Sequence, residues 1–106
     1  MVLRLFVSLL AAAVALAHGP AARAYPDKPV RLVVGYPAGD STDLAARVVA
    51  AALGDFFNQK FIVEDHAGSN GTLAMTRVGK ADHDGHTLLV APSTLAAVPG
   101  LYPGFA

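Results

Sequence analysis

Short apolar runs alternate along the chain with longer segments whose apolar residues have helical spacing. Val30 to Gly35 is a nearly continuous, valine-rich run, which is typical of a strand buried on both faces of a parallel sheet. Shorter runs at Phe61 to Glu64 and at Thr87 to Ala91 predict a second and a third strand. Glycine, proline and polar residues between these runs predict turns.

The segment after the first predicted strand predicts a helix. It begins at Ser41 or Thr42, with Ser41 as the predicted N-cap and Asp43 in the first turn, and it ends between Gly54 and Asn58. Its apolar positions recur three to four residues apart: Leu44, Val48, Ala51, Ala52 and Phe56.

Two further helices are predicted. One follows a glycine-containing loop at His66 to Gly71, with Thr72 as its predicted cap. Its apolar positions are Leu73, Met75, Val78 and Ala81. The other is short, begins after the loop Pro92 to Thr94, and should stop at Pro99.

The alternating order of strands and helices predicts an α/β fold with right-handed crossovers on a parallel sheet. The loops Pro37 to Asp43 and Ala91 to Thr94 each follow a strand and precede a helix. Both should therefore lie at the carboxyl edge of the sheet, where such folds bind ligands. The N–H groups at the start of the first helix also favour a carboxylate or another anion there.

The first 24 residues have the pattern of an export signal. Arg4 gives a positive start, Leu5 to Ala17 a thirteen-residue apolar core, and Ala22 to Ala24 a small-x-small cleavage pattern. The alternative is a membrane anchor, but the core is shorter than the roughly 18 residues that span a bilayer. We predict cleavage between Ala24 and Tyr25, which gives a signal peptide at 1–24 and a single small domain at 25–106. His18 then lies in the removed segment and has no role.

Composition narrows the possible functions. Residues 25–106 hold six basic and eight acidic residues, without a basic run, so no nucleic-acid partner is predicted. The sequence has no basic amphipathic helix, so we predict no attachment to a membrane surface. The chain has no cysteine, which excludes disulfides and thiol chemistry and is compatible with a bacterial periplasm.

Catalytic and metal-binding patterns are weak. The chain lacks Gly-x-Ser-x-Gly, Gly-x-x-x-x-Gly-Lys and Gly-x-Gly-x-x-Gly, so we predict no enzyme, no catalytic residue and no cofactor. His83 and His86 flank Asp84 and Gly85, but spacing alone supports a metal site, and we interpret them as a polar turn with no metal. We also interpret His66 as a solvated loop residue and Arg47 as part of a structural ion pair.

Four blocks of residues carry a family resemblance. They are Tyr25-Pro-x-Lys-Pro-Val-Arg-Leu-Val-Val, Tyr36-Pro-Ala-Gly-x-Ser-Thr-Asp-x-x-Ala-Arg, Val63-Glu64 with Gly68-x-x-Gly71, and Asp84-Gly85-x-Thr87-Leu88-Leu89. In this order they resemble the tripartite tricarboxylate transporter substrate-binding proteins, the TctC or Bug family of extracytoplasmic solute receptors.

The resemblance implies a type II-like periplasmic binding-protein fold of two α/β domains. Such a protein grips a small carboxylate or dicarboxylate between its domains and delivers it to the membrane permease subunits of the transporter. Family members are several times longer than residues 25–106, so the resemblance implies an incomplete amino-terminal lobe. Three alternatives remain open for it: a truncated receptor, a small exported structural or interaction module, and a remnant without function.

The resemblance also implies the binding residues. In the family, the loop after the first strand holds a ligand carboxylate through backbone amides, hydroxyls and ordered waters, and the loop after a later strand contributes. These roles fall here on Tyr36, Pro37, Ala38, Gly39, Ser41, Thr42, Asp43, Ser93 and Thr94.

The sequence departs from the family pattern in three places. Asp40 stands where a second glycine is typical, Asp65 to Ala67 where Asn-Arg-Pro is usual, and His86 where an aromatic residue is usual. A carboxylate at position 40 either points inward and repels an anionic ligand, or points outward and caps the helix in place of Ser41. His86 is expected to replace an aromatic packing contact.

Overall fold

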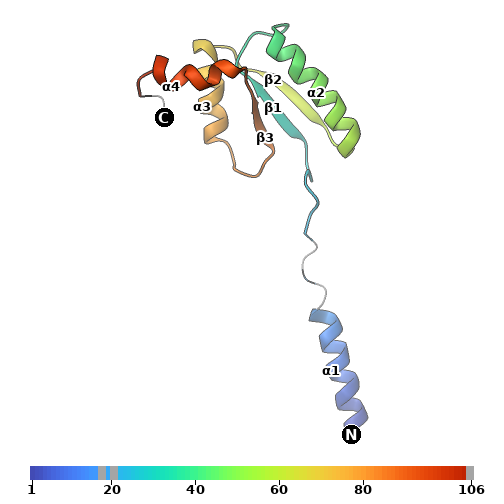
Figure 1. Ribbon diagram of the computed structural model, residues 1–106. Coiled ribbons are helices and arrows are strands. Elements are labelled where there is room, and N and C mark those ends of the chain that lie inside the picture. The colour runs from blue at the N-terminus through green and yellow to red at the C-terminus, as the bar shows by residue number, and fades with distance from the viewer. Residues whose placement is uncertain (17–18, 20–21, 105–106) are drawn as a thin grey trace.

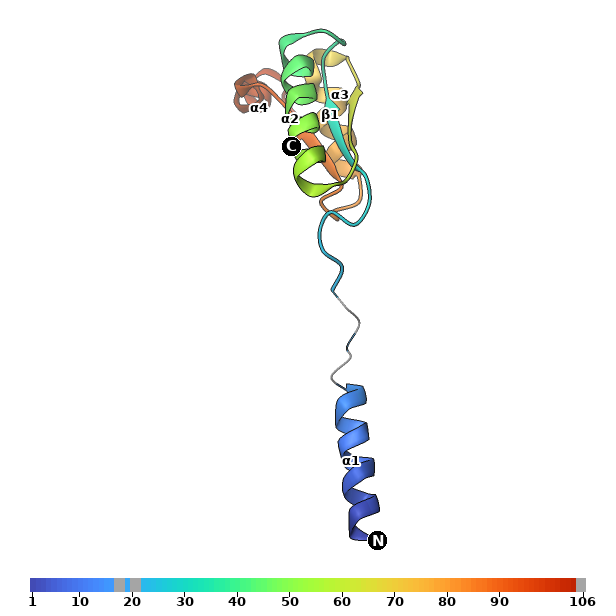
Figure 2. The ribbon, with the colours of Figure 1, turned by 90° about the vertical axis from the view of Figure 1, so that its right-hand side faces the viewer.

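The computed structural model describes residues 1–16, 19 and 22–104. Helix α1 (Val2–Leu16) stands clear of an α/β body in both views (Figures 1 and 2). Its large apolar side chains are exposed, for example Leu3 and Phe6. No helix among the described residues is long and apolar enough to cross a membrane. Ala17 and His18, which the sequence places in the signal segment, lie outside the described residues.

The body alternates strands and helices, as the sequence predicts. Its elements are β1 (Val30–Val34), α2 (Ser41–Phe57), β2 (Phe61–Asp65), α3 (Thr72–Lys80), β3 (Thr87–Val90) and α4 (Val98–Leu101), with 3₁₀ turns at Ser69–Gly71 and Ser93–Ala97. The three predicted strands are confirmed to within one residue at each end. The α/β fold class is therefore confirmed.

The three strands form one parallel sheet in the order β2-β1-β3. Val34, the last residue of β1, lies opposite Asp65 in β2 and Val90 in β3. Figure 2 shows α2 and α3 on opposite faces of this sheet, as right-handed crossovers on either side of a central strand require. The loops after β1 and β3 therefore leave the same edge from neighbouring strands, which confirms the predicted convergence.

The core is centred on β1, whose valines and leucine are at most 2% exposed. On the α2 face, Val30 and Leu32 pack with Ala50, and Phe61, Val63 and Val90 surround them. Burying a valine or leucine side chain contributes about 1.5–3 kcal/mol to folding. The strand that leads into the predicted ligand loop is thus the most firmly held element of the body.

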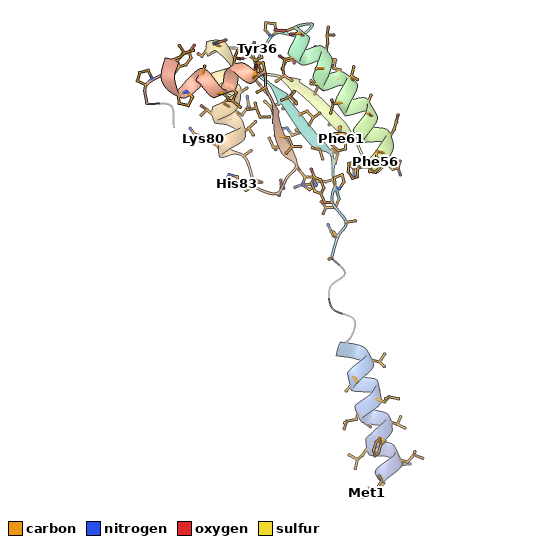
Figure 3. All side chains as sticks on the ribbon, in the orientation of Figure 1. Met1, Tyr36, Phe56, Phe61, Lys80 and His83 are labelled. Atoms are coloured by element: carbon orange, nitrogen blue, oxygen red, sulfur yellow. The ribbon has the colours of Figure 1, made fainter. Side chains whose placement is uncertain are left out.

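The buried face of α2 differs from the apolar positions noted in the sequence. Leu44, Val48 and Phe56 are 56%, 72% and 80% exposed, and Phe56 lies at the far end of the helix (Figure 3). The buried residues are Asp43, Ala46 and Ala50. Both sets have helical spacing, and the small alanines allow the helix axis to come close to the sheet. The turn before α2, tied to Asp43, fixes which set faces inward.

The structure also corrects three helix ends. Asp40, not Ser41, is the N-cap of α2, and Gly71, not Thr72, is the N-cap of α3. Pro99 does not stop the last helix but lies in the first turn of α4. A proline is tolerated there because the first N–H groups of a helix have no partner within it.

Candidate functional site

The loop between β1 and α2 forms a tight turn at the carboxyl edge of the sheet. We call residues 36–42 the anion loop. The N–H of Asp40 donates to the carbonyl oxygen of Pro37 over 3.1 Å. Gly39 has a φ of 88°, and a Cβ at this position would meet no atom within 4 Å. Glycine is therefore required here for its backbone conformation and not for space.

Several N–H groups of the anion loop are already used within the chain. Gly39 donates to Oδ2 of Asp43 over 2.8 Å, and Thr42 donates to Oδ1 of Asp40 over 3.4 Å. Pro37 has no N–H to offer. Oxygen atoms of the chain itself therefore accept from several of the N–H groups that the sequence suggested as free donors for a ligand.

Two N–H groups at exposed residues of the loop remain available. Those of Ala38 and Ser41 have no hydrogen-bond partner among the described residues, and both residues are exposed. Ser41 is the first residue of the 17-residue helix α2, whose amino end carries a partial positive charge. The loop therefore presents two backbone donors and a helix dipole to solvent.

The carboxylate of Asp40 caps helix α2, which is the second of the two alternatives that the sequence left open. Its Oδ1 accepts from the N–H of Thr42 and, over 3.0 Å, from the hydroxyl of Ser41. The carboxylate satisfies one of the free donors of α2. Its negative charge nevertheless stays beside the N–H of Ser41.

Asp43 lies beneath the loop and not on its surface. The residue is 1% exposed, and its Oδ2 accepts from Gly39 and, over 3.1 Å, from Nε of Arg47. The Gly39 N–H, followed by the Arg47 guanidinium, holds the pKa of Asp43 below its ordinary value. Asp43 therefore supports the turn from inside.

Arg47 joins α2 to β2 below the anion loop. Its NH2 lies 3.2 Å from Oδ2 of Asp65, in addition to its bond with Asp43, which confirms Arg47 as part of a structural ion pair. Burial, followed by the neighbouring Asp43, raises the pKa of Asp65. Sequence reasoning noted Asp65 only as a departure from the family pattern. Its position at the end of a strand beside β1 was the signal that could have linked it to the loop.

Tyr36 and Gly71 lie against each other where β1 ends. A Cβ at Gly71 would be 3.0 Å from the Tyr36 hydroxyl oxygen, and a Cβ at Gly35 would be 2.8 Å from the Gly71 Cα. Figure 3 shows Tyr36 at the end of the sheet where α2 and α3 begin. The two glycines permit this close approach, which packs the start of α3 against the base of the anion loop.

Ser93 and Thr94 begin the 3₁₀ turn that follows β3 at the same edge. Both are exposed, and neither hydroxyl has a partner within the described part of the chain. The fold thus brings all the predicted site residues to one edge of the sheet, with Asp43 below it.

A chain of ionic contacts lies on the opposite face of the sheet from Asp65. Arg31 donates to both carboxylate oxygens of Glu64 over 2.7 and 2.6 Å, and Glu64 Oε2 lies 3.2 Å from Nε2 of His66. Arg77 lies 3.0 Å from Nδ1 of His66 and can only donate, so Nε2 carries the ring proton. The interpretation of His66 as a solvated residue is therefore wrong. Arg31 lowers the pKa of Glu64 to about 2.

The turn with His83 and His86 lies at the other edge of the sheet, as the position of His83 in Figure 3 shows. His86 is buried, and its ring packs edge-on against Tyr25 at 4.9 Å, which confirms the predicted aromatic replacement. Asp84 accepts from the His86 N–H over 3.0 Å and pairs with Lys28 over 2.8 Å. In residues 1–16, 19 and 22–104, no three side chains of the metal-ligating types gather into a group.

Comparison with known proteins places this geometry in a family. A scan against models of protein families finds no match. BugT of Bordetella pertussis is 34% identical over 95 residues, which are 90% of this chain and 29% of BugT. Among solved structures, one described as a periplasmic transporter has a TM-score of 0.72 and 34% identity, over 76% of this chain and 27% of its own.

Two further structures match the same body. MatC from Rhodopseudomonas palustris, solved with bound malate, has a TM-score of 0.71 and 38% identity, over 77% of this chain and 28% of MatC. A TctC solute-binding protein from Polaromonas, solved without a ligand, has a TM-score of 0.68 and 30% identity, over 73% of this chain and 27% of its own.

The fold and these likenesses define the class as periplasmic solute-binding proteins. Within that class, the chain belongs to the Bug family, also called TctC, which confirms the resemblance seen in the sequence. It spans 27–29% of the length of the relatives named above. The three solved relatives are described as a periplasmic transporter, a solute-binding protein and a protein with bound malate, in agreement with the expectation that the chain is not an enzyme.

Proposed function

We propose that residues 25–106 form part of one lobe of a periplasmic receptor, and that the anion loop binds a carboxylate group of a small carboxylate or dicarboxylate. The observation that carries this proposal is that the N–H groups of Ala38 and Ser41, two exposed residues, have no partner among the described residues. A hydrogen bond from a backbone N–H to a charged carboxylate contributes about 1.5–3 kcal/mol. Two such bonds at the amino end of α2 suit an anion.

Neighbouring groups support the same ligand chemistry. The hydroxyls of Ser93 and Thr94 lie at the same edge without partners in the described part of the chain, and they complete the set of donors. Thr42 adds a hydroxyl, Tyr36 and Pro37 line the loop, and Gly39 with Asp43 keeps its shape. MatC, which shares this fold, binds malate, a dicarboxylate.

The proposal includes the context of the receptor. Residues 1–24 act as a signal peptide that is cleaved after Ala24, and the solute passes to the membrane permease subunits of a tripartite tricarboxylate-type transporter. In the complete receptor a second lobe closes over the ligand. Residues 25–106 contact one side of the ligand only, so we expect weak binding, with a Kd on the order of 1 mM.

Replacing Ser41 tests the role of its N–H. Ser41→Pro removes that N–H at the first helical position, where proline is favoured. The change suits the fold because Asp40 has φ −64° and ψ 159°, the conformation that a following proline requires. Ser41→Ala is the matched control, because it removes only the hydroxyl. Thermal unfolding of the full chain and both variants is measured with malate, adipate or a neutral polyol, each at roughly ten times the expected Kd.

The proposal expects malate or adipate to raise the melting temperature of the wild type and of Ser41→Ala. At roughly ten times Kd the stabilisation is about 1.4 kcal/mol. Ser41→Pro should fold but lose this response. Equal responses of the two variants, or an equal effect of the polyol, would contradict the proposal.

A further inference from the structure

Two buried carboxyl oxygens beneath the anion loop have no hydrogen-bond donor among the described residues. Oδ1 of Asp43 and Oδ1 of Asp65 are both buried, and neither accepts a hydrogen bond from the described residues. One guanidinium contacts both carboxyl groups, because Arg47 lies 3.1 Å from Oδ2 of Asp43 and 3.2 Å from Oδ2 of Asp65. Their Oδ2 atoms are already engaged, both by Arg47 and one also by Gly39. The side chain of Asp43 is 2% exposed and that of Asp65 is 18% exposed.

Charge around this pair favours one added proton. Two carboxylates and one guanidinium leave a net negative charge, and two like charges held on one guanidinium repel each other. One proton between the Oδ1 atoms turns that repulsion into a charge-assisted hydrogen bond and satisfies both oxygens.

Within the described residues, no other charged group competes for this proton. From α2, Asp43 and Arg47 are the charged groups that face Asp65. Glu64 of β2 and His66, which follows β2, pair with Arg31 and Arg77 on the other face of the sheet. From β1, the residues on this face are valine and leucine. The raised pKa of Asp65 and the lowered pKa of Asp43 agree with a proton carried on Asp65.

We propose that Asp43 and Asp65 share one proton between their Oδ1 atoms, and that this proton fastens the anion loop to β2. The shared proton holds the Asp43 carboxyl so that Oδ2 meets the N–H of Gly39. Asp65 is thus a positioning residue for the loop. When Asp65 loses the proton, a negative charge is added beneath the loop and repels a bound carboxylate. This effect on the ligand rests on the proposed function, whereas the sharing of the proton does not.

Carboxyl-carbon NMR of the full, ¹³C-labelled chain between about pH 2 and 8 tests the shared proton directly. We expect Asp43 and Asp65 to titrate in two coupled steps, the second above the ordinary aspartate pKa of about 3.9. Two independent titrations near that ordinary value would overturn the proposal.

Amide exchange of Gly39 tests whether the proton fastens the loop. Asp65→Asn supplies a permanent N–H donor and should keep exchange slow at every pH after correction for the intrinsic rate. Asp65→Ala should raise the exchange rate about tenfold, as expected when one buried hydrogen bond is lost. Asp55→Asn, which changes an exposed aspartate of α2, is the control and should have no effect. Equal exchange in Asp65→Asn and Asp65→Ala would overturn the proposal.

Stability provides an independent readout. Because the pKa of Asp65 is raised in the folded state, the free energy of unfolding should fall as pH rises through that pKa. Asp65→Asn should abolish this fall, and its persistence in that variant would count against the shared proton. If malate fails to stabilise any variant at any pH, the proposed function fails, while the NMR and exchange results still decide the shared proton.

Discussion

The N–H of Gly39 donates to Oδ2 of Asp43 over 2.8 Å, so the turn after β1 is held by the first turn of the helix that follows it. Turn and helix thereby form one rigid unit on either side of Asp40. Of the two available N–H groups, that of Ala38 directly precedes Gly39, and that of Ser41 lies between Gly39 and Asp43. For the proposed binding of a carboxylate, fixed directions of these N–H groups reduce the entropy lost.

Removing the charge of Asp40 should strengthen carboxylate binding without loss of the helix cap. Asp40→Asn keeps an oxygen that accepts from Thr42, so stability should stay within about 0.5 kcal/mol of the wild type. Two unit charges about 4 Å apart repel by ~1 kcal/mol in water and by ~4 kcal/mol at an effective dielectric of about 20, so the malate Kd should fall at least several-fold. Titration calorimetry measures the Kd.

Asp40→Ala separates the two roles of that residue. It removes both the charge and the cap, and should destabilise the fold by about 1 kcal/mol. Weaker malate binding by Asp40→Asn than by the wild type would show that the Asp40 carboxylate does not repel the ligand.

Gly35→Ala should destabilise the body. The added methyl group would lie 2.8 Å from the Gly71 Cα, a backbone atom that cannot move without shifting the start of α3. Overpacking of this kind lowers the free energy of unfolding by about 1–3 kcal/mol. In a domain of this size, each kcal/mol lowers the melting temperature by roughly 4–8 °C. Chemical denaturation of the full chain gives the free energy of unfolding.

Gly79→Ala is the control with the opposite expected sign. Gly79 lies in α3, and a methyl group added there would meet no atom within 4 Å, so alanine should stabilise the helix by about 0.5–1 kcal/mol. Similar effects of the two glycine substitutions would argue against close packing at Gly35.

Paired substitutions on the two sides of α2 should behave differently. Val48→Lys changes a side chain that is 72% exposed, and the free energy of unfolding should change by no more than about 0.5 kcal/mol. Ala46→Leu enlarges a fully buried residue and should cost about 1–3 kcal/mol. Urea denaturation followed by circular dichroism distinguishes them. A larger loss for Val48→Lys would place the opposite face of α2 against the sheet.

The ion pair of Glu64 with Arg31 should contribute to stability at neutral pH and fail in acid. The folded-state pKa of Glu64 is about 2 against an ordinary 4.5, so its contribution is complete above pH 4.5 and is lost as pH falls toward 2. Glu64→Gln should therefore flatten the decline in unfolding free energy over this range. An unchanged acid profile would mean that the pair stabilises nothing, and Asp55→Asn controls for the loss of a charge.

Much of the fold was predictable because local patterns suffice for it. The apolar run at Val30 to Gly35 and the two shorter runs predict strands, and alternation with helices predicts parallel pairing. Parallel pairing in turn places the loops after β1 and β3 at one edge, so the position of Ser41 relative to Ser93 followed from chain order.

The details of the candidate site were less predictable, since they depend on which atoms meet. Asp40 and Ser41 are both good capping residues, and nothing in their order indicates which one caps α2. Likewise, Leu44, Val48 and Phe56 have the same helical spacing as Ala46 and Ala50, so periodicity alone does not select the buried set.

By itself, the sequence determined the three strands, their order along the chain, the family and the edge of the sheet that the loops after β1 and β3 share. These properties follow from hydrophobic spacing and from turn residues, which act over a few positions. Only the tertiary structure decided that Asp43, Arg47 and Asp65 meet beneath the loop and that, among the described residues, nothing takes up the N–H groups of Ala38 and Ser41. Such contacts join residues from separate elements, and their geometry depends on the packing of α2 against β1 and β2.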